Sequence, residues 1–278
     1  MIDVRDWSRA DTARMLRVPT SSDDKYSRGV VALRTGSDAY PGAAVLGVEA
    51  AWRAGAGFVR FVGGRRVSDA VIARRPETVA GADIGRARAD AWVIGSGTDA
   101  ASRTPAEERA LREVLDGTAP VVVDAGALDL AREASAPLVV TPHAGEFARL
   151  RESLELDANG SGDRARDAAE VSRRLSSIVL LKGATTLIAS PDGAVMAVSA
   201  APGWLATAGS GDVLAGALGA LIAANRSSLL AEAVAAGAWL HGHAAALASG
   251  AQEGRRGHPI VALDVAEALP AAIEDLLS

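Results

Sequence analysis

The sequence predicts an α/β protein built around a mostly parallel β-sheet. Short runs rich in Val, Ile and Leu alternate along the chain with longer segments rich in Ala, as expected when helices connect parallel strands. The chain has 278 residues, of which 49% are hydrophobic, so it is long enough to bury a large core. Aromatic residues make up only 4%, which suits closely packed helices on a sheet better than an all-β barrel.

The individual elements follow from these runs in chain order. Residues 1–24 are polar and are expected to form a short helix and a connector. The expected strands are residues 28–33, 57–62, 91–95, 120–124, 137–141 and 178–182. The expected helices are residues 40–55, 105–115, 144–150, 164–175, 213–224, 231–249 and 264–277. Because no linker or internal repeat separates them, we expect residues 1–278 to form a single domain.

One pair of strands is expected to depart from the parallel pattern. Residues 187–190 and 195–199 flank Pro191, Asp192 and Gly193, a composition typical of hairpin turns. We expect this hairpin to lie at the edge of the sheet. In open α/β sheets, ligands bind beyond the carboxyl ends of the parallel strands. Polar residues that follow the strands are therefore the candidates for a functional site.

Composition disfavours several classes of function. The net charge is -5 and the basic residues are dispersed, so nothing favours binding to nucleic acid or to an anionic membrane. The chain has no cysteine, which excludes disulfides and thiolate metal sites. It also has no apolar run long enough to span a membrane and no signal-peptide pattern at its start. We expect a cytoplasmic protein.

The most informative segment is residues 207–216, where a glycine-rich turn precedes an apolar helix. Amides at the start of such a helix, here those of Gly209 and Gly211, favour a bound anion such as phosphate. Asp212 would then lie beside that phosphate, where it could take a proton from an attacking hydroxyl. The alternative is a capped helix whose glycines serve close packing.

Other polar groups follow the remaining strands. Gly97 belongs to a glycine-containing turn that could let the backbone approach a ligand, or be a plain turn. Asp124 could hold Mg²⁺ through water, or cap the next helix. His143 and Glu146 could present two polar groups to one ligand, or cap a helix. Lys182 could reach a nucleotide phosphate, or be a lysine at an exposed strand end.

Two common nucleotide-binding patterns are missing. The sequence has no G-x-x-x-x-G-K-[ST] loop and no G-x-G-x-x-G after its first strand, which disfavours P-loop and Rossmann proteins. Taken in order, its motifs instead resemble those of the ribokinase-like NAD(P)H-hydrate dehydratases. The motifs are Lys25-Tyr-Ser-Arg-Gly29, Gly36-Ser-Asp-Ala-Tyr-Pro-Gly-Ala-Ala44, Ala54-Gly-Ala-Gly-Phe-Val59, Ile94-Gly-Ser-Gly97, Val123-Asp-Ala-Gly-Ala-Leu128, Thr141-Pro-His-Ala-Gly-Glu146, Leu181-Lys-Gly-Ala-Thr-Thr186 and Ala208-Gly-Ser-Gly-Asp-Val-Leu-Ala-Gly216. The Tyr-Pro-Gly-Ala and Thr-Pro-His-x-Gly-Glu motifs are the most selective.

The resemblance implies a three-layer α/β/α sandwich and a role in metabolite repair. Such enzymes are lyases that act on NADHX and NADPHX, the hydrates formed when water adds to the reduced nicotinamide ring. They phosphorylate the added hydroxyl from ADP or ATP with Mg²⁺ and then eliminate phosphate. For this chain the resemblance favours ADP. It also implies a homo-oligomer and a separate NAD(P)HX epimerase in the same pathway.

The resemblance also assigns roles to residues of this chain. It implies that Asp212 is the catalytic base, that the Gly209 and Gly211 amides hold the transferring phosphoryl group, and that Glu146 is the candidate Mg²⁺ ligand. The substrate would contact Ala43, Gly97, His143 and Asp212. The nucleotide would be bound by Lys182, Gly183, Ala184, Thr185 and Thr186 together with Gly209 and Gly211.

The chain departs from the family pattern in five places. Gly126 replaces a second Asp, Ala208 replaces a Gly, Trp204 replaces a smaller residue, Ala144 replaces a Pro, and Gly95-Ser-Gly-Thr-Asp99 replaces a Gly-Pro-Gly-Leu-Gly turn. These departures leave two alternatives open. One is a ribokinase-like kinase of a small alcohol, such as a hydroxyethylthiazole or pyridoxal type. The other is a catalytically silent nucleotide-binding regulator.

Overall fold

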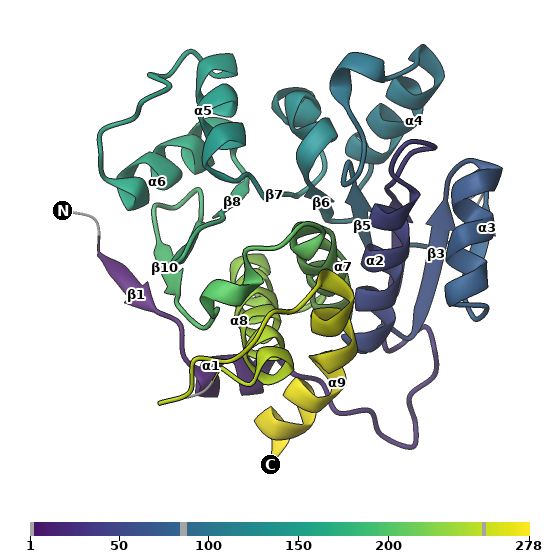
Figure 1. Cartoon of the computed structure of the whole chain (residues 1–278). Coiled ribbons are helices and arrows are strands. Elements are labelled where there is room, and N and C mark those ends of the chain that lie inside the picture. The colour runs from purple at the N-terminus through teal and green to yellow at the C-terminus, as the bar shows by residue number, and fades with distance from the viewer. Residues whose placement is uncertain (1–2, 84–87, 252–253) are drawn as a thin grey trace.

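The computed structural model describes residues 3–83, 88–251 and 254–278, and its centre is one ten-stranded sheet (Figure 1). The strand order is β1-β10-β9-β8-β7-β6-β5-β2-β3-β4. The strands are β1 (Val4–Asp6), β2 (Val30–Arg34), β3 (Phe58–Val62), β4 (Val79–Gly81), β5 (Ala91–Ile94), β6 (Val121–Val123), β7 (Leu138–Val140), β8 (Ile178–Leu181), β9 (Thr186–Ala189) and β10 (Val195–Val198). All neighbouring pairs are parallel except β8–β9 and β9–β10.

Helices cover both faces of the sheet. The α-helices are α1 (Arg9–Met15), α2 (Pro41–Arg53), α3 (Arg65–Arg74), α4 (Pro105–Leu115), α5 (Ala144–Ser153), α6 (Arg164–Leu175), α7 (Ser210–Ala224), α8 (Leu230–Ser249) and α9 (Ala262–Leu277). Three short 3₁₀ segments also lie in the described chain, namely η1 (Ala100–Ser102), η2 (Ala125–Glu133) and η3 (Gly203–Leu205). None of the helices in the described residues is both long and apolar enough to cross a bilayer.

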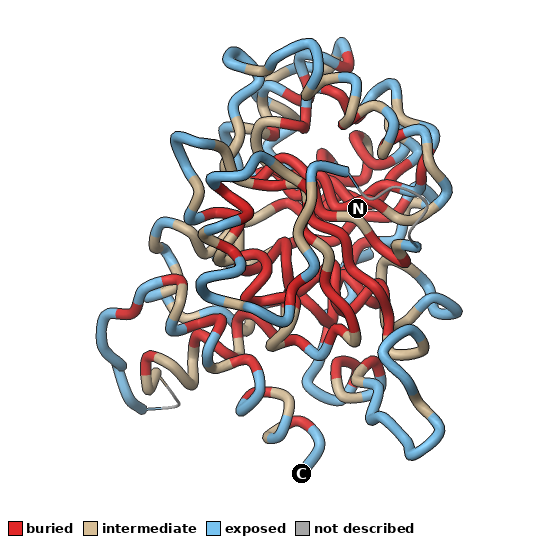
Figure 2. Tube along the Cα trace, turned by 90° about the vertical axis from the view of Figure 1, so that its right-hand side faces the viewer, coloured by how far each residue is buried: buried red, intermediate tan, exposed pale blue. Residues whose placement is uncertain are grey.

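Alternation along the strands divides the core into two apolar clusters. In β7, Val139 joins one cluster while Leu138 and Val140 join the other, because successive strand side chains point to opposite faces. The first cluster packs against α1, α2, α3, α7, α8 and α9, and the second against α4, η2, α5 and α6. Figure 2 shows this buried core enclosed by exposed loops and helix faces. The predicted three-layer, mostly parallel α/β fold is confirmed.

Helix α7 approaches its neighbours through glycines. A side chain at Gly216 would collide with the backbone carbonyl of Gly47 in α2. One turn further along α7, a Cβ on Gly219 would lie 2.7 Å from Val93 and 2.9 Å from Val31 of the sheet. Small residues therefore let α7 lie close to both α2 and the strands. This packing holds the start of α7 at the carboxyl ends of the strands.

Differences from the expected elements occur at the margins of the sheet. The hairpin of β9 and β10 forms as expected, but the prediction that it lies at the edge is wrong, because β1 pairs with β10 outside it. β1 lies within residues 1–24, for which only a helix and a connector are predicted; residues 1 and 2 of that segment lie outside the described residues. All three residues of β1 are exposed and two of them are charged, so they carry no strand pattern. α3 and β4 are likewise unpredicted.

Candidate active site

The carboxyl ends of the parallel strands bring four polar side chains together. Asp124 follows β6 and is buried, and its Oδ1 accepts hydrogen bonds from Thr141 Oγ1 at 2.8 Å and Lys182 Nζ at 2.9 Å. Its Oδ2 accepts from Ser96 Oγ at 3.0 Å. Asp124 occupies the cap position of η2, but its side chain makes no capping hydrogen bond. Of the two roles considered for Asp124, side-chain capping is therefore absent.

Helix α7 begins at Gly209, whose φ of 86° lies in the left-handed region that favours glycine. No side chain caps this helix. The backbone amides of Gly209 and Gly211 donate no hydrogen bond to any described residue. Unpaired amides at a helix start, together with the helix dipole, make an anion-binding site. The geometry of residues 207–216 thus has the free donors that the sequence predicts.

Asp212 lies in the first turn of α7 and is partly buried. The pKa of its carboxyl is raised to about 6, chiefly by burial and then by the negative charge of Asp124, while the Lys182 ammonium opposes the rise. A carboxyl with a pKa near neutrality can accept a proton from a hydroxyl and release it again. Asp212 therefore has the protonation behaviour of a general base.

Lys182 links these groups. Its Nζ lies 3.8 Å from Glu146 Oε2 in addition to its hydrogen bond with Asp124. A Cβ placed on Gly211 would lie 3.6 Å from Nζ, so the ammonium is close to the start of α7. An anion bound at that helix start would therefore meet a positive charge as well as the free amides. This arrangement favours the phosphate-binding role over that of an exposed strand-end lysine.

A cavity of about 480 Å³ opens beside Lys182 and the start of α7. The residues that line it are mainly apolar, with a few polar ones among them, which is typical of a site for a small organic ligand. Five of the predicted nucleotide-binding residues line it, namely Lys182, Gly183, Ala184, Thr186 and Gly211. His143 lines it as well.

Two of the predicted nucleotide-binding residues are not among those that line this cavity. The Thr185 hydroxyl lies 3.1 Å from Ser199 Oγ, and the Thr185 carbonyl accepts from Arg164. A Cβ on Gly209 would lie 2.7 Å from Leu46 and 3.0 Å from Ala262, so a larger residue would not fit here without a shift.

His143 and Glu146 form a capping box at the start of α5. His143 Nδ1 accepts from the Gly145 amide at 3.0 Å, and Glu146 Oε2 accepts from the His143 amide at 2.8 Å. Because Nδ1 is an acceptor, the neutral ring carries its proton on Nε2. The His143 side chain is 57% exposed, and its Nε2 lies 3.4 Å from Glu146 Oε1. The capping role is thus realised, and it leaves a binding role possible.

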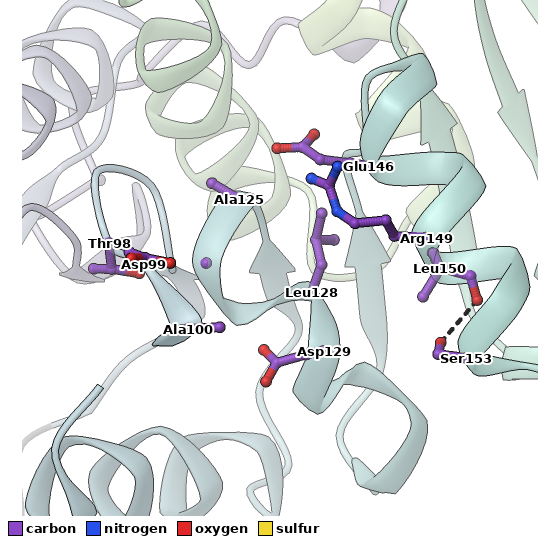
Figure 3. A pocket seen from close by; sticks show the side chains of 11 residues that line it. Thr98, Asp99, Ala100, Ala125, Leu128, Asp129, Glu146, Arg149, Leu150 and Ser153 are labelled. Atoms are coloured by element: carbon purple, nitrogen blue, oxygen red, sulfur yellow. Dashed lines mark hydrogen bonds between the residues drawn. The ribbon is translucent and has the colours of Figure 1, made fainter. Parts of the chain in front are cut away.

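A second cavity of about 430 Å³ includes Glu146 of this turn in its wall (Figure 3). It is bounded by the loop after β5, by η2 and by α5, with Glu146 and Arg149 of α5 across from Ala125 and Leu128 of η2. The His143–Glu146 turn therefore contributes to both cavities, since His143 lines the first and Glu146 the second.

The departure at Gly126 has a structural explanation. A side chain at this position would collide with the backbone carbonyl of Thr98, which lines the same second cavity. Arg103 donates to the Gly126 carbonyl and pairs with Asp129, so this loop is held in place. An aspartate at residue 126 would not fit without moving the loop that contains Thr98.

The structure brings Ala43 and Gly97 into direct contact. Gly97 has a φ of 68°, and a Cβ on it would collide with the Ala43 side chain. Ala43 lies in the first turn of α2 and Gly97 in the loop after β5, next to the buried hydroxyl of Ser96. Neither residue lines one of the two cavities described above, so their predicted contact with the substrate rests on the resemblance alone.

The sequence does not single out His241 as a site residue. It is only 5% exposed and lines the 480 Å³ cavity from α8. The sequence gives little sign of this position because His241 lies within an alanine-rich helix. Trp204, in contrast, is not among the lining residues; its Nε1 donates to the Arg256 carbonyl at 2.7 Å.

A family profile described as NAD(P)H-hydrate dehydratase matches residues 31–264. The bifunctional NAD(P)H-hydrate repair enzyme Nnr of Mycobacterium tuberculosis is 42% identical over 236 residues, which cover 81% of this chain and 47% of that protein. The ADP-dependent (S)-NAD(P)H-hydrate dehydratase of Xanthomonas campestris is 32% identical over 244 residues, or 80% of this chain and 83% of that one. This chain thus spans about half the length of the bifunctional relative.

Among solved structures, this chain is similar to the ADP/ATP-dependent NAD(P)H-hydrate dehydratase from Bacillus subtilis, co-crystallised with ATP and Mg²⁺. The identity is 28% and the TM-score 0.86, with 99% of this chain and 100% of that chain covered. The likeness therefore extends over the whole fold, including the strand ends where the two cavities lie.

Proposed function

This chain belongs to the NAD(P)H-hydrate dehydratase family, and on that premise we propose that it converts NADHX and NADPHX to NADH and NADPH with ADP or ATP as phosphoryl donor. The observation that carries the proposal is the position of Asp212. Its carboxyl, with a pKa of about 6, lies in the first turn of a helix whose free amides and neighbouring Lys182 suit a phosphate. A base beside a phosphoryl site is the arrangement that phosphorylation of a hydroxyl requires.

The reaction divides between the two cavities. The nucleotide occupies the 480 Å³ cavity, with its terminal phosphate at Gly211 and Lys182. The hydrated dinucleotide lies across the His143–Glu146 turn and reaches Ala43 and Gly97. Asp212 removes the proton of the ring hydroxyl as that oxygen attacks the terminal phosphorus, and the shortened nucleotide leaves. The Gly209 and Gly211 amides hold the transferring oxygens, where charge develops.

Loss of phosphate completes the dehydration. Hydroxide is a poor leaving group at neutral pH, whereas phosphate is a good one. The lone pair of the neighbouring ring nitrogen expels phosphate from the ring carbon, and loss of a proton from the next carbon restores the double bond. The exposed His143 side chain can contact the substrate during these steps.

Mg²⁺ fits this site as an ion held mainly by phosphates and water. The described residues contain no cluster of three or more His, Cys, Asp or Glu side chains able to hold a metal. Mg²⁺ in phosphoryl-transfer enzymes commonly uses only one or two carboxylates and keeps several waters. Glu146 is the candidate ligand, through water because its Oε2 already accepts from the His143 amide. When bound, the ion would neutralise phosphate charge.

Several further features belong to the same proposal. We favour ADP as donor, a homo-oligomeric and cytoplasmic protein, and a separate epimerase that interconverts the two hydrate epimers. Helix α8 packs on α1, α7 and α9 within the chain. On that helix His243 stacks on Trp239 and hydrogen bonds Asp275 of α9 at 2.7 Å.

The test is the recovery of absorbance at about 340 nm from purified NADHX or NADPHX in the presence of Mg²⁺ and either ADP or ATP. Nucleotide-dependent recovery would support the dehydratase and identify its donor. A stable phosphorylated product from a small alcohol, without recovery from either hydrate, would favour a small-alcohol kinase. Nucleotide binding without any turnover would favour the silent regulator.

A further inference from the structure

The turn of residues 182–185 connects β8 to β9, and Lys182, Gly183 and Ala184 of this turn line the 480 Å³ cavity. The backbone amides of Gly183, Ala184 and Thr185 donate no hydrogen bond to any described residue. Successive free amides in a turn form a concavity that binds anions. The turn therefore suits a phosphate as long as its peptide units keep this orientation.

Arg164, the first residue of α6, holds the two ends of the turn. Its guanidinium donates through Nη1 to the Thr185 carbonyl at 3.0 Å and through Nη2 to the Lys182 carbonyl at 3.3 Å. The donors of a guanidinium lie in a rigid planar fork, so they fix the two carbonyls relative to each other. In a trans peptide the carbonyl and the following N–H point in opposite directions. Because Arg164 holds the Lys182 carbonyl, the Gly183 amide points away from Arg164.

Gly183 leaves the space in which this guanidinium lies. A Cβ on Gly183 would lie 2.6 Å from Arg164 Nη2, and its three nearest neighbours would all be atoms of the guanidinium. Gly183 is not among the glycines with a positive φ, so its backbone conformation does not require a glycine. The missing side chain at residue 183 is therefore explained by close packing against Arg164.

We propose that Arg164 is a positioning residue of the nucleotide site, which fixes the turn of residues 182–185 so that its amides stay free for the phosphates of ADP or ATP. The proposal rests on the proposed function, because it assumes that the 480 Å³ cavity is the nucleotide site. Arg164 is not among the residues that line this cavity, so it acts through the turn. It takes no part in proton transfer, and its loss should weaken nucleotide binding without slowing the chemical step.

The experiment measures the Kd of ADP and ATP by calorimetry, and the nucleotide KM and kcat, in the wild type, Arg164→Met and Arg164→Lys. Met removes both hydrogen bonds, so Kd and KM should rise roughly 3- to 10-fold while kcat at saturating nucleotide stays unchanged. Lys keeps the charge and a single donor group, so it should restore part of the affinity. The Asp163 side chain caps α6 through the amides of residues 165 and 166, so the cap survives in both variants.

The matched control is Arg166→Met. Arg166 lies in the same first turn of α6, is exposed and carries the same charge, but the donor to both turn carbonyls is Arg164. Arg166→Met should therefore leave the affinity for ADP and ATP unchanged. A loss equal to that of Arg164→Met would show an effect of net charge alone and would overturn the proposal.

A double-mutant cycle tests the contact between Arg164 and the turn. Gly183→Ala should displace the guanidinium and weaken nucleotide binding, but it should cost much less in the Arg164→Met background, where its methyl group meets no guanidinium. Unchanged affinity in a folded Arg164→Met, or losses that add fully in the double variant, would overturn the proposal. A wild type that binds neither nucleotide would overturn the proposed function and this proposal together. A wild type that binds ADP but recovers no NADH from NADHX would overturn the proposed function alone.

Discussion

Lys182 Nζ lies 2.9 Å from Asp124 Oδ1 at the carboxyl ends of β8 and β6, and the two charges act in opposite directions on Asp212. Asp124 raises the pKa of the Asp212 carboxyl, whereas Lys182 lowers it. Lys182 lies close to the start of α7, and Asp124 accepts hydrogen bonds from the buried hydroxyls of Ser96 and Thr141. The ion pair therefore connects the helix start to these two hydroxyls. The ionisation of the proposed base therefore depends on a structural ion pair.

Substitutions in this ion pair should shift the pH dependence of turnover in opposite directions. Activity needs ionised Asp212, so kcat should rise with pH through a pKa of about 6 in the wild type. Lys182→Met should move this rise to higher pH, and Asp124→Asn should move it to lower pH. The measurement is kcat against pH at saturating nucleotide. Lys182→Arg keeps the positive charge and serves as the control. If Lys182→Met and Asp124→Asn moved the rise in kcat in the same direction along the pH axis, the opposing effects of the two charges on Asp212 would be contradicted.

Asp212→Asn should abolish turnover while leaving ADP binding largely intact. The substitution removes the proton acceptor and keeps the shape, so kcat should fall roughly 100-fold or more. Single-turnover assays on NADHX and calorimetric titration with ADP check the two parts. Turnover close to the wild type would end the proposed role of Asp212.

The same substitution should stabilise the protein above about pH 6. The folded pKa of Asp212 is about 6 and the unfolded value 3.8, so between these values the folded state binds more protons and the wild type loses stability as pH rises. The Asn side chain does not titrate, so the variant does not lose this stability. Its free energy of unfolding relative to the wild type should grow from pH 4 to pH 6 and then stay constant, at about 3 kcal/mol at most. The measurement is the melting temperature of the wild type and of the variant at pH 4 and at pH 8. The same difference between the two proteins at both pH values would contradict the prediction.

Two substitutions at His143 should separate its capping role from its binding role. His143→Ala removes the acceptor for the first amides of α5 and should cost about 1 kcal/mol of stability. His143→Asn can still cap the helix, so its stability should stay near the wild type while the KM for the hydrate rises. Denaturant midpoints and steady-state kinetics test this pair. Unchanged kinetics in His143→Asn would leave His143 with the capping role alone.

Gly216→Ala should destabilise the fold by about 1–3 kcal/mol, because its methyl group would collide with the Gly47 carbonyl where α7 crosses α2. The matched control is Gly42→Ala, which lies in the first turn of α2 with nothing within 4 Å of the added atom. Alanine there should leave stability unchanged or raise it slightly. The measurement is the urea denaturation midpoint of each variant. Equal midpoints for Gly216→Ala and Gly42→Ala would argue against a close crossing of α7 and α2.

Much of the fold follows from local pattern. The expected helix at residues 164–175 matches α6, and that at residues 105–115 matches α4, because Asp163 and Thr104 cap them and Leu175 and Leu115 end their apolar faces. β1 and β4 were missed because each has only three residues, several of them exposed, and they form only by pairing with a neighbouring strand.

The sequence by itself determined the fold class, the glycine-rich start of α7 and the residues that follow each strand, because these depend on periodicity and on backbone requirements that nearby residues meet. Only the tertiary structure decided how those residues act on one another. The ion pair of Asp124 and Lys182, the raised pKa of Asp212 and the hydrogen bonds of Arg164 with the turn of residues 182–185 all arise from burial or from contacts between distant segments. Such quantities depend on distance and solvent exclusion in three dimensions, which chain order does not encode directly.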